Sequence, residues 1–218
     1  MKTNEEVWSI VNELKALYPD SLCSLEYEKD YELLFSVRLA AQCTDERVNK
    51  VTPALFARFP TLEALAEADV AEVEQYIHST GFFRAKARDI VLSSQMLLRD
   101  YGGKVPGTME ELLKLPGVGR KTANLMLGDV FHVPGVVVAD THCIRITGLL
   151  GLTDGSKDPA KVEMQLRQVL PPEESNDFCH RMVLHGRAVC IARRPQCESC
   201  TLRPWCDHFA KNRVGANA

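Results

Sequence analysis

Four cysteines stand close together near the end of the chain. They are Cys190, Cys197, Cys200 and Cys206, with six, two and five residues between them. Four thiolates at this spacing predict a soft metal centre, either a tetrahedral zinc ion or an iron-sulfur cluster. Structural zinc sites more often bring two short C-x-x-C knuckles together, whereas this chain has one C-x-x-C flanked by wider gaps. The spacing therefore favours a [4Fe-4S] cluster held by the four cysteines.

A glycine-containing segment in the middle of the chain has the pattern of an anion-binding turn. It reads Leu115-Pro-Gly-Val-Gly-Arg-Lys-Thr-Ala123, and helical patterns precede and follow it. Pro116 ends the first helix, and the glycines permit torsions and close approaches that side chains would block. The amides of Gly117, Val118 and Gly119 are then expected at the start of the second helix, where they would attract a phosphate. The alternative is an ordinary turn between packed helices, but the surrounding pattern is typical of a DNA-binding helix-hairpin-helix.

Charge is distributed unevenly along the chain. The formal net charge of -3 is unusual for a nucleic-acid-binding protein. Acidic residues dominate between positions 63 and 74, however, whereas arginines are frequent in the C-terminal part. Arg193 and Arg194 lie between the first two clustered cysteines, so a metal-bound loop would hold both guanidinium groups outward for phosphate contact. A basic face with an acidic back is compatible with nucleic-acid binding.

Most of the chain has the apolar spacing of helices. The segments are bounded by capping residues, glycines and prolines, and they cover residues 7–17, 32–42, 44–59, 61–68, 69–79, 84–101, 110–114, 124–130, 140–150, 159–170 and 174–192. The β-branched run Val136 to Val138 is short and lies between Pro134 and Asp140. The sequence therefore predicts an all-α fold.

The composition is that of a soluble globular protein, since 45% of the 218 residues are hydrophobic and 25% are charged. The polar, acidic start of the chain does not resemble a secretory signal, and no apolar run is long enough to cross a bilayer. We therefore expect a cytoplasmic protein with no membrane partner. Disulfides are rare in that compartment, so we interpret the isolated cysteines as small buried hydrophobes: Cys23, Cys43, Cys143 and Cys179.

Further motifs occur in a fixed order around the turn. Val138-Ala-Asp-Thr-His142 follows it, and Leu184-His-Gly-Arg187 directly precedes the clustered cysteines. Leu39-Ala-Ala-Gln-Cys-Thr-Asp45 and Gly81-Phe-Phe-Arg-Ala-Lys86 lie in the first half of the chain. Together these motifs resemble the endonuclease III family, a group of base-excision DNA glycosylases with AP lyase activity. The resemblance covers nearly the whole chain.

The resemblance implies two helical domains and damaged double-stranded DNA as the partner. A six-helix barrel with the helix-hairpin-helix is expected over residues 23–133. An iron-sulfur cluster domain formed by both chain ends is expected over residues 1–22 and 134–218. DNA would lie across the cleft between them. Nothing in the sequence indicates a stable oligomer, so we expect a monomer, associated with the nucleoid if the source is bacterial.

The resemblance also places the catalytic groups at Lys121 and Asp140. Lys121, as a neutral amine, would attack C1′ of a damaged nucleotide such as thymine glycol and form a Schiff base, after which β-elimination breaks the strand on the 3′ side. The helix N-terminus and the adjacent Arg120 both disfavour the ammonium form. Asp140 precedes a predicted helix, so it is an N-cap, a catalytic carboxylate that stabilises charge or moves a proton, or both.

A base inside a duplex must be flipped out before Lys121 can reach its sugar, and the gap must be filled. By resemblance, Gln42 and Phe82 are the candidates to fill it. An aromatic residue at position 82 departs from the aliphatic family pattern, and a core position is the alternative for Phe82. His142 and His185 either contact DNA or pack, with packing expected for His185.

Two other functions fit parts of the sequence. A monofunctional adenine or mismatch glycosylase of the same superfamily usually lacks a lysine at the position of Lys121, and its adenine-removing branch carries a further C-terminal domain that we do not see here. A non-catalytic DNA-binding module with a redox-sensing cluster would explain the hairpin and the cysteines. That module would leave Lys121 and Asp140 without a role.

Overall fold

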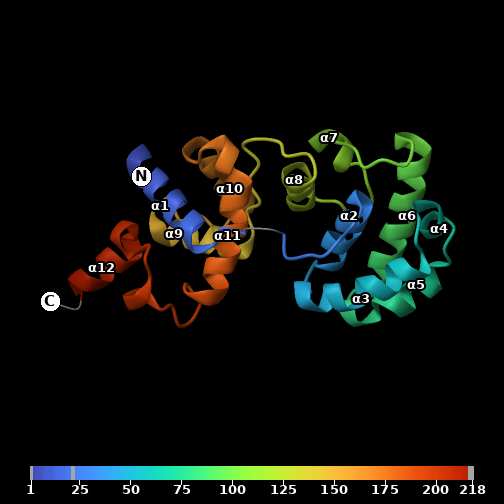
Figure 1. Cartoon of the computed structure of the whole chain (residues 1–218), viewed down its shortest axis with the longest axis horizontal. Helices are drawn as coiled ribbons and strands as arrows, with labels where there is room; N and C mark the ends of the chain where they lie inside the picture. The colour runs from blue at the N-terminus through green and yellow to red at the C-terminus, as the bar shows by residue number, and fades with distance from the viewer. Residues whose placement is uncertain (1, 21–22, 216–218) are drawn as a thin grey trace. The chain divides into compact units, whose positions relative to one another are not determined.

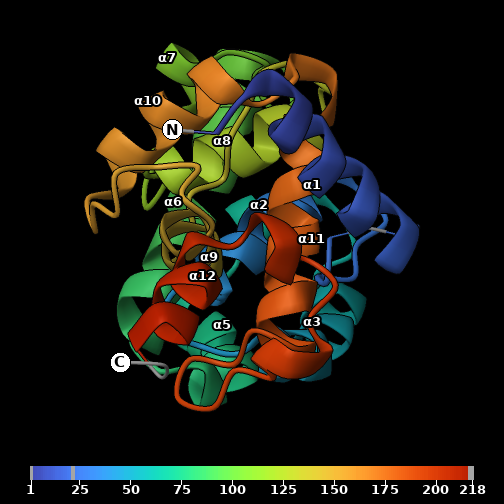
Figure 2. The same ribbon diagram turned by 90° about the vertical axis from the view of Figure 1, so that its left-hand side faces the viewer.

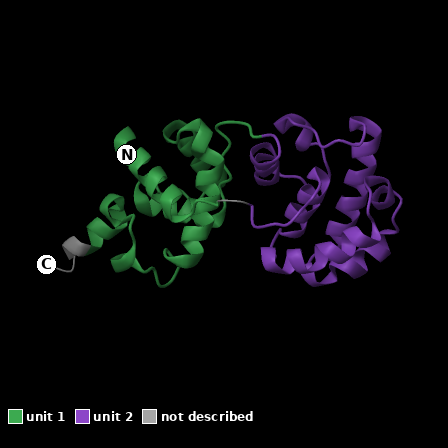
Figure 3. Cartoon of the chain, in the orientation of Figure 1, with its two compact units in different colours: residues 1–22, 132–218 green, residues 23–131 purple. Residues whose placement is uncertain are grey.

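The computed structural model describes residues 2–20 and 23–215, with side chains through residue 212 (Figure 1). These residues form helices and loops and contain no strand, which confirms the predicted all-α class. The chain divides into two compact units: unit 1 comprises Met1–Leu22 and His132–Ala218, and unit 2 comprises Cys23–Phe131 (Figure 3). The division falls two residues before the limit expected from the sequence at Val133.

Unit 2 is built around α2 and α6. Its elements are α2 (Asp30–Leu39), α3 (Asp45–Arg58), α4 (Leu62–Ala66), α5 (Val70–Ile77), the 3₁₀ turn η1 (His78–Thr80), α6 (Phe83–Tyr101), α7 (Met109–Leu112) and α8 (Arg120–Asp129). The long helix α6 packs against α4, α5 and α2, and α2 also contacts α3 and α8. Leu33, Leu34, Phe35 and Leu39 of α2 are buried, so this helix belongs to the core as its apolar sequence predicted.

Local signals set most of the helix starts in unit 2. Side-chain oxygens accept N–H groups of the first helical turn at Thr44, Thr61 and Asp69, the residues at which these helices were predicted to begin. The end of α2 was predicted too late, because the helix stops at Leu39 rather than Gln42. A turn follows, in which the Cys43 N–H donates to the Ala40 carbonyl at 3.1 Å and Gln42 has a φ of 55°.

Unit 1 packs α11 against α1 and α9 (Figure 2). Its elements are α1 (Asn4–Leu17), α9 (Thr141–Leu150), α10 (Pro159–Val169), η2 (Pro172–Glu174), α11 (Ser175–Ala188), η3 (Cys197–Ser199), η4 (Arg203–Trp205) and α12 (Asp207–Gly215). The apolar side chains buried in it include Ile10, Leu14, Ile146, Phe178 and Met182. Burial of these residues on helical spacing explains why the amphipathic pattern predicted α1, α9 and α11.

The C-terminal part differs from the sequence prediction. The predicted helix 174–192 ends at Ala188, because the Cys190 N–H donates back to the His185 carbonyl at 2.8 Å and the chain turns into the cysteine loop. Helix α12, which follows the last clustered cysteine, was not predicted from the sequence. Val136 to Val138 are buried without forming a strand. No helix in the described part of the chain is long and apolar enough to cross a membrane.

The isolated cysteines are not all buried. Cys143 and Cys179 are buried as predicted, whereas Cys23 and Cys43 are half-buried. The hydrogen bond with Cys179, together with burial, raises the pKa of the Cys143 thiol, and burial raises the pKa of Cys23 to about 12. Neither Cys23 nor Cys143 is therefore an activated thiol.

Candidate active site and cysteine cavity

The helix-hairpin-helix consists of α7, the turn that follows it and α8. The Val118 N–H donates to the Leu115 carbonyl at 3.1 Å and thereby closes the turn. The prediction that this amide binds an anion is therefore wrong. Gly119 is the N-cap of α8 and provides no side-chain cap. The N–H groups of Gly117 and Gly119 meet no acceptor among the described residues. The hairpin therefore presents uncapped amides at a helix N-terminus, an arrangement suited to phosphate.

An ion pair between α2 and α6 packs directly against Gly117 of the hairpin. Arg38 donates from Nε and Nη2 to Asp89 Oδ2 at 2.9 and 2.7 Å. Gly117, with a φ of +74°, lies so close to this pair that a Cβ would come within 2.5 Å of Arg38 Nε and 2.6 Å of Asp89 Oδ2. Ser93 Oγ also donates to the Pro116 carbonyl at 3.0 Å. Gly117 is thus required for both its backbone conformation and its close packing.

Lys121 is the second residue of α8, and its side chain is exposed. It forms no hydrogen bond or ion pair with any residue that the structure describes. The opposite face of α8 is anchored by buried residues, among them Ala123, Met126 and Leu127. A rigid helix therefore presents an exposed amine that is accessible to a substrate.

Asp140 has both carboxylate oxygens engaged. Its Oδ1 accepts the Cys143 N–H at 2.7 Å, which confirms the predicted N-cap of α9, and its Oδ2 lies 3.0 Å from Nδ1 of His142. Gly186 of α11 faces this imidazole: a Cβ there would lie 2.6 Å from His142 Cδ2 and 3.0 Å from Ile146 Cδ1. The glycine of the Leu184–Arg187 motif thus permits the close approach that holds His142 beside Asp140.

The two residues expected to fill the gap in DNA both lie on exposed turns of unit 2. Phe82 is 70% exposed with a φ of 48°, and Gln42 is exposed with a φ of 55°. The exposure of Phe82 rules out the alternative of a core position. His185, by contrast, is 1% exposed, which confirms that it packs inside the protein.

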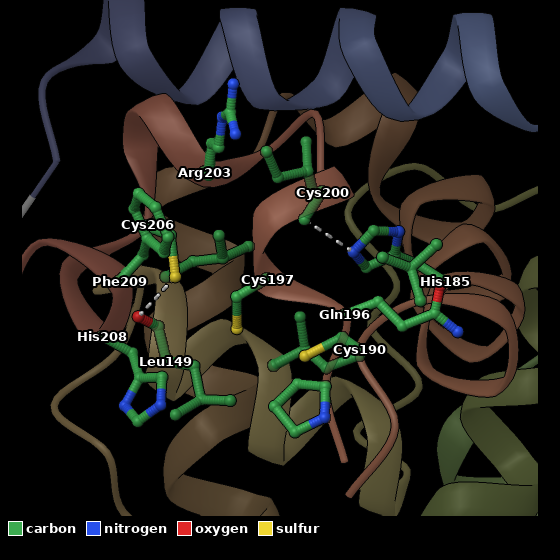
Figure 4. Close-up of a pocket in the computed structure, with 15 residues that line it drawn as sticks. Leu149, His185, Cys190, Gln196, Cys197, Cys200, Arg203, Cys206, His208 and Phe209 are labelled. Atoms are coloured by element: carbon green, nitrogen blue, oxygen red, sulfur yellow. Dashed lines mark hydrogen bonds between the residues drawn. The ribbon is translucent and has the colours of Figure 1, made fainter. Parts of the chain in front are cut away.

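The four clustered cysteines surround one cavity in unit 1. Cys190, Cys197, Cys200 and Cys206 line about 440 Å³ of space, part of it open to solvent (Figure 4). In the described part of the chain, no group of three or more His, Cys, Asp or Glu residues is arranged to hold a metal ion. The structure nevertheless brings all four predicted ligands to one cavity.

Two further residues that the sequence did not connect with the clustered cysteines contact their sulfur atoms, and one of them, His185, also lines the cavity. His185 Nε2 lies 3.6 Å from Cys200 Sγ, and Arg145 donates to Cys190 Sγ at 3.5 Å. Burial raises the pKa values of the Cys190, Cys197 and Cys200 thiols, and burial followed by the charge of Arg145 lowers the pKa of His185. His185 belongs to a motif of the sequence, but only its position in the fold reveals the contact with Cys200.

Arg193 and Arg194 are exposed in the loop between α11 and η3. This loop joins the first two clustered cysteines, as the sequence indicated. The structure thus gathers the cysteines at one cavity and pairs Asp140 with His142, both in unit 1. It places Lys121 beside the hairpin amides in unit 2.

Known proteins match almost the entire chain. The sequence model of the HhH-GPD superfamily, base excision DNA repair proteins, matches residues 35–172. Endonuclease III of Synechocystis is 49% identical over 193 residues and 88% of each chain, and that of Bacillus subtilis is 40% identical over 190 residues, which are 87% of this chain and 86% of the relative. A solved trapped endonuclease III–DNA covalent intermediate is similar with a TM-score of 0.90 and 40% identity, covering 98% of this chain and 100% of that one. The chain therefore belongs to the endonuclease III family of the HhH-GPD superfamily and is a DNA glycosylase with AP lyase activity.

Proposed function

We propose that this glycosylase removes oxidised pyrimidines from double-stranded DNA, with Lys121 as the nucleophile and Asp140 as the catalytic carboxylate. The observation that carries the proposal is the position of Lys121, exposed and unpaired among the described residues in the first turn of α8. A DNA phosphate bound at the uncapped amides of the hairpin would bring the neighbouring sugar toward this amine. The covalent intermediate trapped with DNA in a related endonuclease III supports the same chemistry here.

In the proposed reaction the Lys121 amine attacks C1′ of the damaged nucleotide. The bond between C1′ and the base breaks, and its electron pair leaves with the base, which takes up a proton. The bond between C1′ and O4′ then breaks, and O4′ keeps its electron pair and takes up a proton released from the amine nitrogen. The product is a Schiff base between Lys121 and the opened sugar, and this Schiff base acidifies the protons on C2′. Loss of a C2′ proton expels the 3′ phosphate by β-elimination, and water then releases Lys121.

Asp140 is proposed to stabilise the positive charge that develops on the sugar or to take a proton during attack. The hydrogen bonds to the Cys143 amide and to His142 hold its carboxylate in one orientation. Such fixed orientation is what electrostatic stabilisation requires, since no reorganisation is then needed as the charge forms. The cap is an observed role of Asp140, and the catalytic role is our proposal.

Damaged duplex DNA is the proposed partner of a monomeric protein. Gln42 and Phe82 would fill the gap left by the flipped nucleotide. The remaining proposed contacts are the hairpin residues Gly117, Val118 and Gly119, with His142, Arg193 and Arg194 in unit 1. Val118 would contribute through its place in the turn, because its amide is already used.

We propose that the cysteine cavity holds a [4Fe-4S] cluster. A donor set of four thiols around one cavity fits such a group in its chemistry. The cluster would cross-link residues 190–206, and it would have no part in breaking bonds. Arg193 and Arg194, in the loop between two of the cysteines, would then be held outward to bind phosphate.

Borohydride trapping on a duplex with a single thymine glycol tests the function. We expect a covalent adduct from the wild type and from Lys114→Gln, and none from Lys121→Gln. Lys114 is the matched control, because it is an exposed lysine of the same hairpin and pairs with Glu110. Base release by the wild type without any adduct would indicate a monofunctional glycosylase. Binding without base release would indicate a DNA-binding module.

A further inference from the structure

A buried lysine joins the two exposed turns of unit 2. Lys86 of α6 is 0% exposed, and its Nζ donates to the carbonyls of Leu39 and Thr80 at 2.8 Å each. Leu39 is the last residue before the turn that carries Gln42, and Thr80 directly precedes Gly81 and Phe82. Both carbonyl oxygens contact one nitrogen, so they can be no further apart than twice that distance.

The two acceptors explain why an ammonium is stable at this buried position. Leu39 ends α2 and Thr80 ends η1, and the last carbonyls of a helix lack intrahelical partners and carry partial negative charge. Lys86 satisfies both and uses two of its three donors. Burial lowers the pKa of Lys86, which reflects the cost of placing a charge here. An apolar side chain would avoid that cost but would leave both carbonyls unpaired.

Lys86 also constrains Phe82 through the backbone. Its N–H donates to the Phe82 carbonyl at 3.2 Å, while its side chain holds the Thr80 carbonyl on the other side of Gly81. Gly81 and Phe82 both have positive φ, a conformation that a phenylalanine keeps only when its surroundings fix it. The same side chain reaches the turn that holds Gln42 at positive φ.

The same face of α6 supports the phosphate-binding hairpin. Lys86, Asp89 and Ser93 follow at helical spacing and therefore lie on one side of the helix. Asp89 holds the ion pair on which Gly117 packs, and Ser93 binds the Pro116 carbonyl. One rigid helix thus anchors the two exposed turns and the hairpin in a fixed arrangement.

We propose that Lys86 is a positioning residue that holds the turns of Gln42 and Phe82 together for entry into the duplex, so that it promotes extrusion of the nucleotide rather than bond breaking. The inference rests on the role proposed above for Gln42 and Phe82. It assigns a buried lysine, distant in sequence from Lys121, to the step that precedes chemistry.

The test compares two substrates that differ in the cost of extrusion. One duplex holds thymine glycol paired with adenine, and the other holds it in a mismatched bubble, where unstacking costs less. Lys86→Met keeps the side-chain length and removes the donors. We expect it to release base about 10- to 100-fold more slowly from the paired duplex, with a much smaller loss on the bubble. In the paired duplex, a 2-aminopurine placed beside the lesion should become more fluorescent when the wild type binds, and this rise should be lost with Lys86→Met.

Ser94→Ala is the matched control, because Ser94 is also buried on α6 and, among the residues that the structure describes, its hydroxyl bonds only to the Ile90 carbonyl of the same helix. It should behave as the wild type on both substrates, and Lys86→Arg should recover part of the paired-duplex rate. Equal slowing of Lys86→Met on the two substrates, or no slowing, would overturn the inference. A wild type that releases base from neither substrate would instead refute the proposed function.

A second variant covers the case in which Lys86→Met does not fold. Gly81→Ala disturbs only the turn, because its φ is +70° and no atom lies within 4 Å of the added Cβ. We expect the same selective loss on the paired duplex. If Gly81→Ala slows both substrates equally, the turn does not act in extrusion and the inference fails.

Discussion

Replacement of Asp140 by asparagine and by alanine should separate its two roles. The cap depends on one oxygen that accepts the Cys143 N–H at 2.7 Å, and asparagine offers an equivalent oxygen. Asp140→Asn should therefore keep the free energy of unfolding, whereas Asp140→Ala should lose about 1 kcal/mol of it. For a chain of this size that loss lowers Tm by about 2–4 °C.

The rate of base release should depend on the negative charge of Asp140 rather than on its hydrogen bond as an N-cap. Both variants lose the carboxylate that His142 holds at 3.0 Å, and a missing charge-stabilising or proton-transfer group typically slows a reaction about 10²- to 10³-fold. We therefore expect similar losses of base release for Asp140→Asn and Asp140→Ala despite their different stabilities. Single-turnover release of thymine glycol and thermal unfolding measure the two quantities separately.

A second aspartate cap in the same unit is the control. Asp158 caps α10 by accepting the Ala160 N–H at 2.9 Å, so Asp158→Asn makes the same chemical change at the same helical position. It should leave base release unchanged. Asp140 would be only a cap if Asp140→Asn retained the wild-type rate. The separation of roles would be refuted if Asp140→Asn lost as much stability as Asp140→Ala.

Three further outcomes follow from the structure. Gly117→Ala should weaken binding to an abasic-site duplex, because its Cβ would collide with the ion pair of Arg38 and Asp89. Gly119→Ala should bind normally, because no atom lies within 4 Å of its Cβ. Fluorescence anisotropy measures both affinities, and equal binding by the two variants would contradict the packing argument. Cys200→Ser should lose bound iron and DNA affinity together, and wild-type iron content would exclude it as a ligand. The pKa of Glu174 is lowered from 4.5, chiefly by its hydrogen bond from Lys15, so its stabilising effect is present above pH 4.5 and is lost as the pH falls through the lower folded value. Glu174→Gln should thus be less stable than the wild type in urea at pH 7, and a difference that persisted in strong acid would refute this linkage.

Local sequence signals predicted a helix well where a capping residue or a helix-breaking residue stands at its end. Thr44, Asp69 and Asp140 cap the helices that they were expected to begin, because the cap is a hydrogen bond within a few residues. The end of α11 at Ala188 was misplaced, because it depends on how the chain turns into the cysteine loop. Apolar spacing continues past Ala188, so periodicity alone could not show the stop.

Residues that act through distant partners were beyond reach of the sequence pattern. In the sequence, Lys86 cannot be distinguished from a solvated lysine on an amphipathic helix. Its burial depends on the carbonyls of Leu39 and Thr80, which are 47 and 6 residues away. The ion pair of Arg38 with Asp89 joins residues 51 positions apart. Spacing along one helix cannot indicate such contacts, since they form only when several helices pack.

The glycines of the motifs show how the fold refines an interpretation drawn from sequence. From the sequence, Gly117 was expected to permit a backbone torsion and a close approach that a side chain would block. The structure shows that the groups it approaches are Arg38 and Asp89, with which a Cβ at this position would collide. Gly186 likewise leaves room for His142, which in turn holds Asp140. In both motifs the absence of a side chain lets polar residues pack closely against the backbone: Arg38 and Asp89 at Gly117, and His142 at Gly186. A substitution at either glycine should therefore act by moving those residues, and its effect on DNA binding or base release should follow from the changed geometry rather than from a lost contact with DNA.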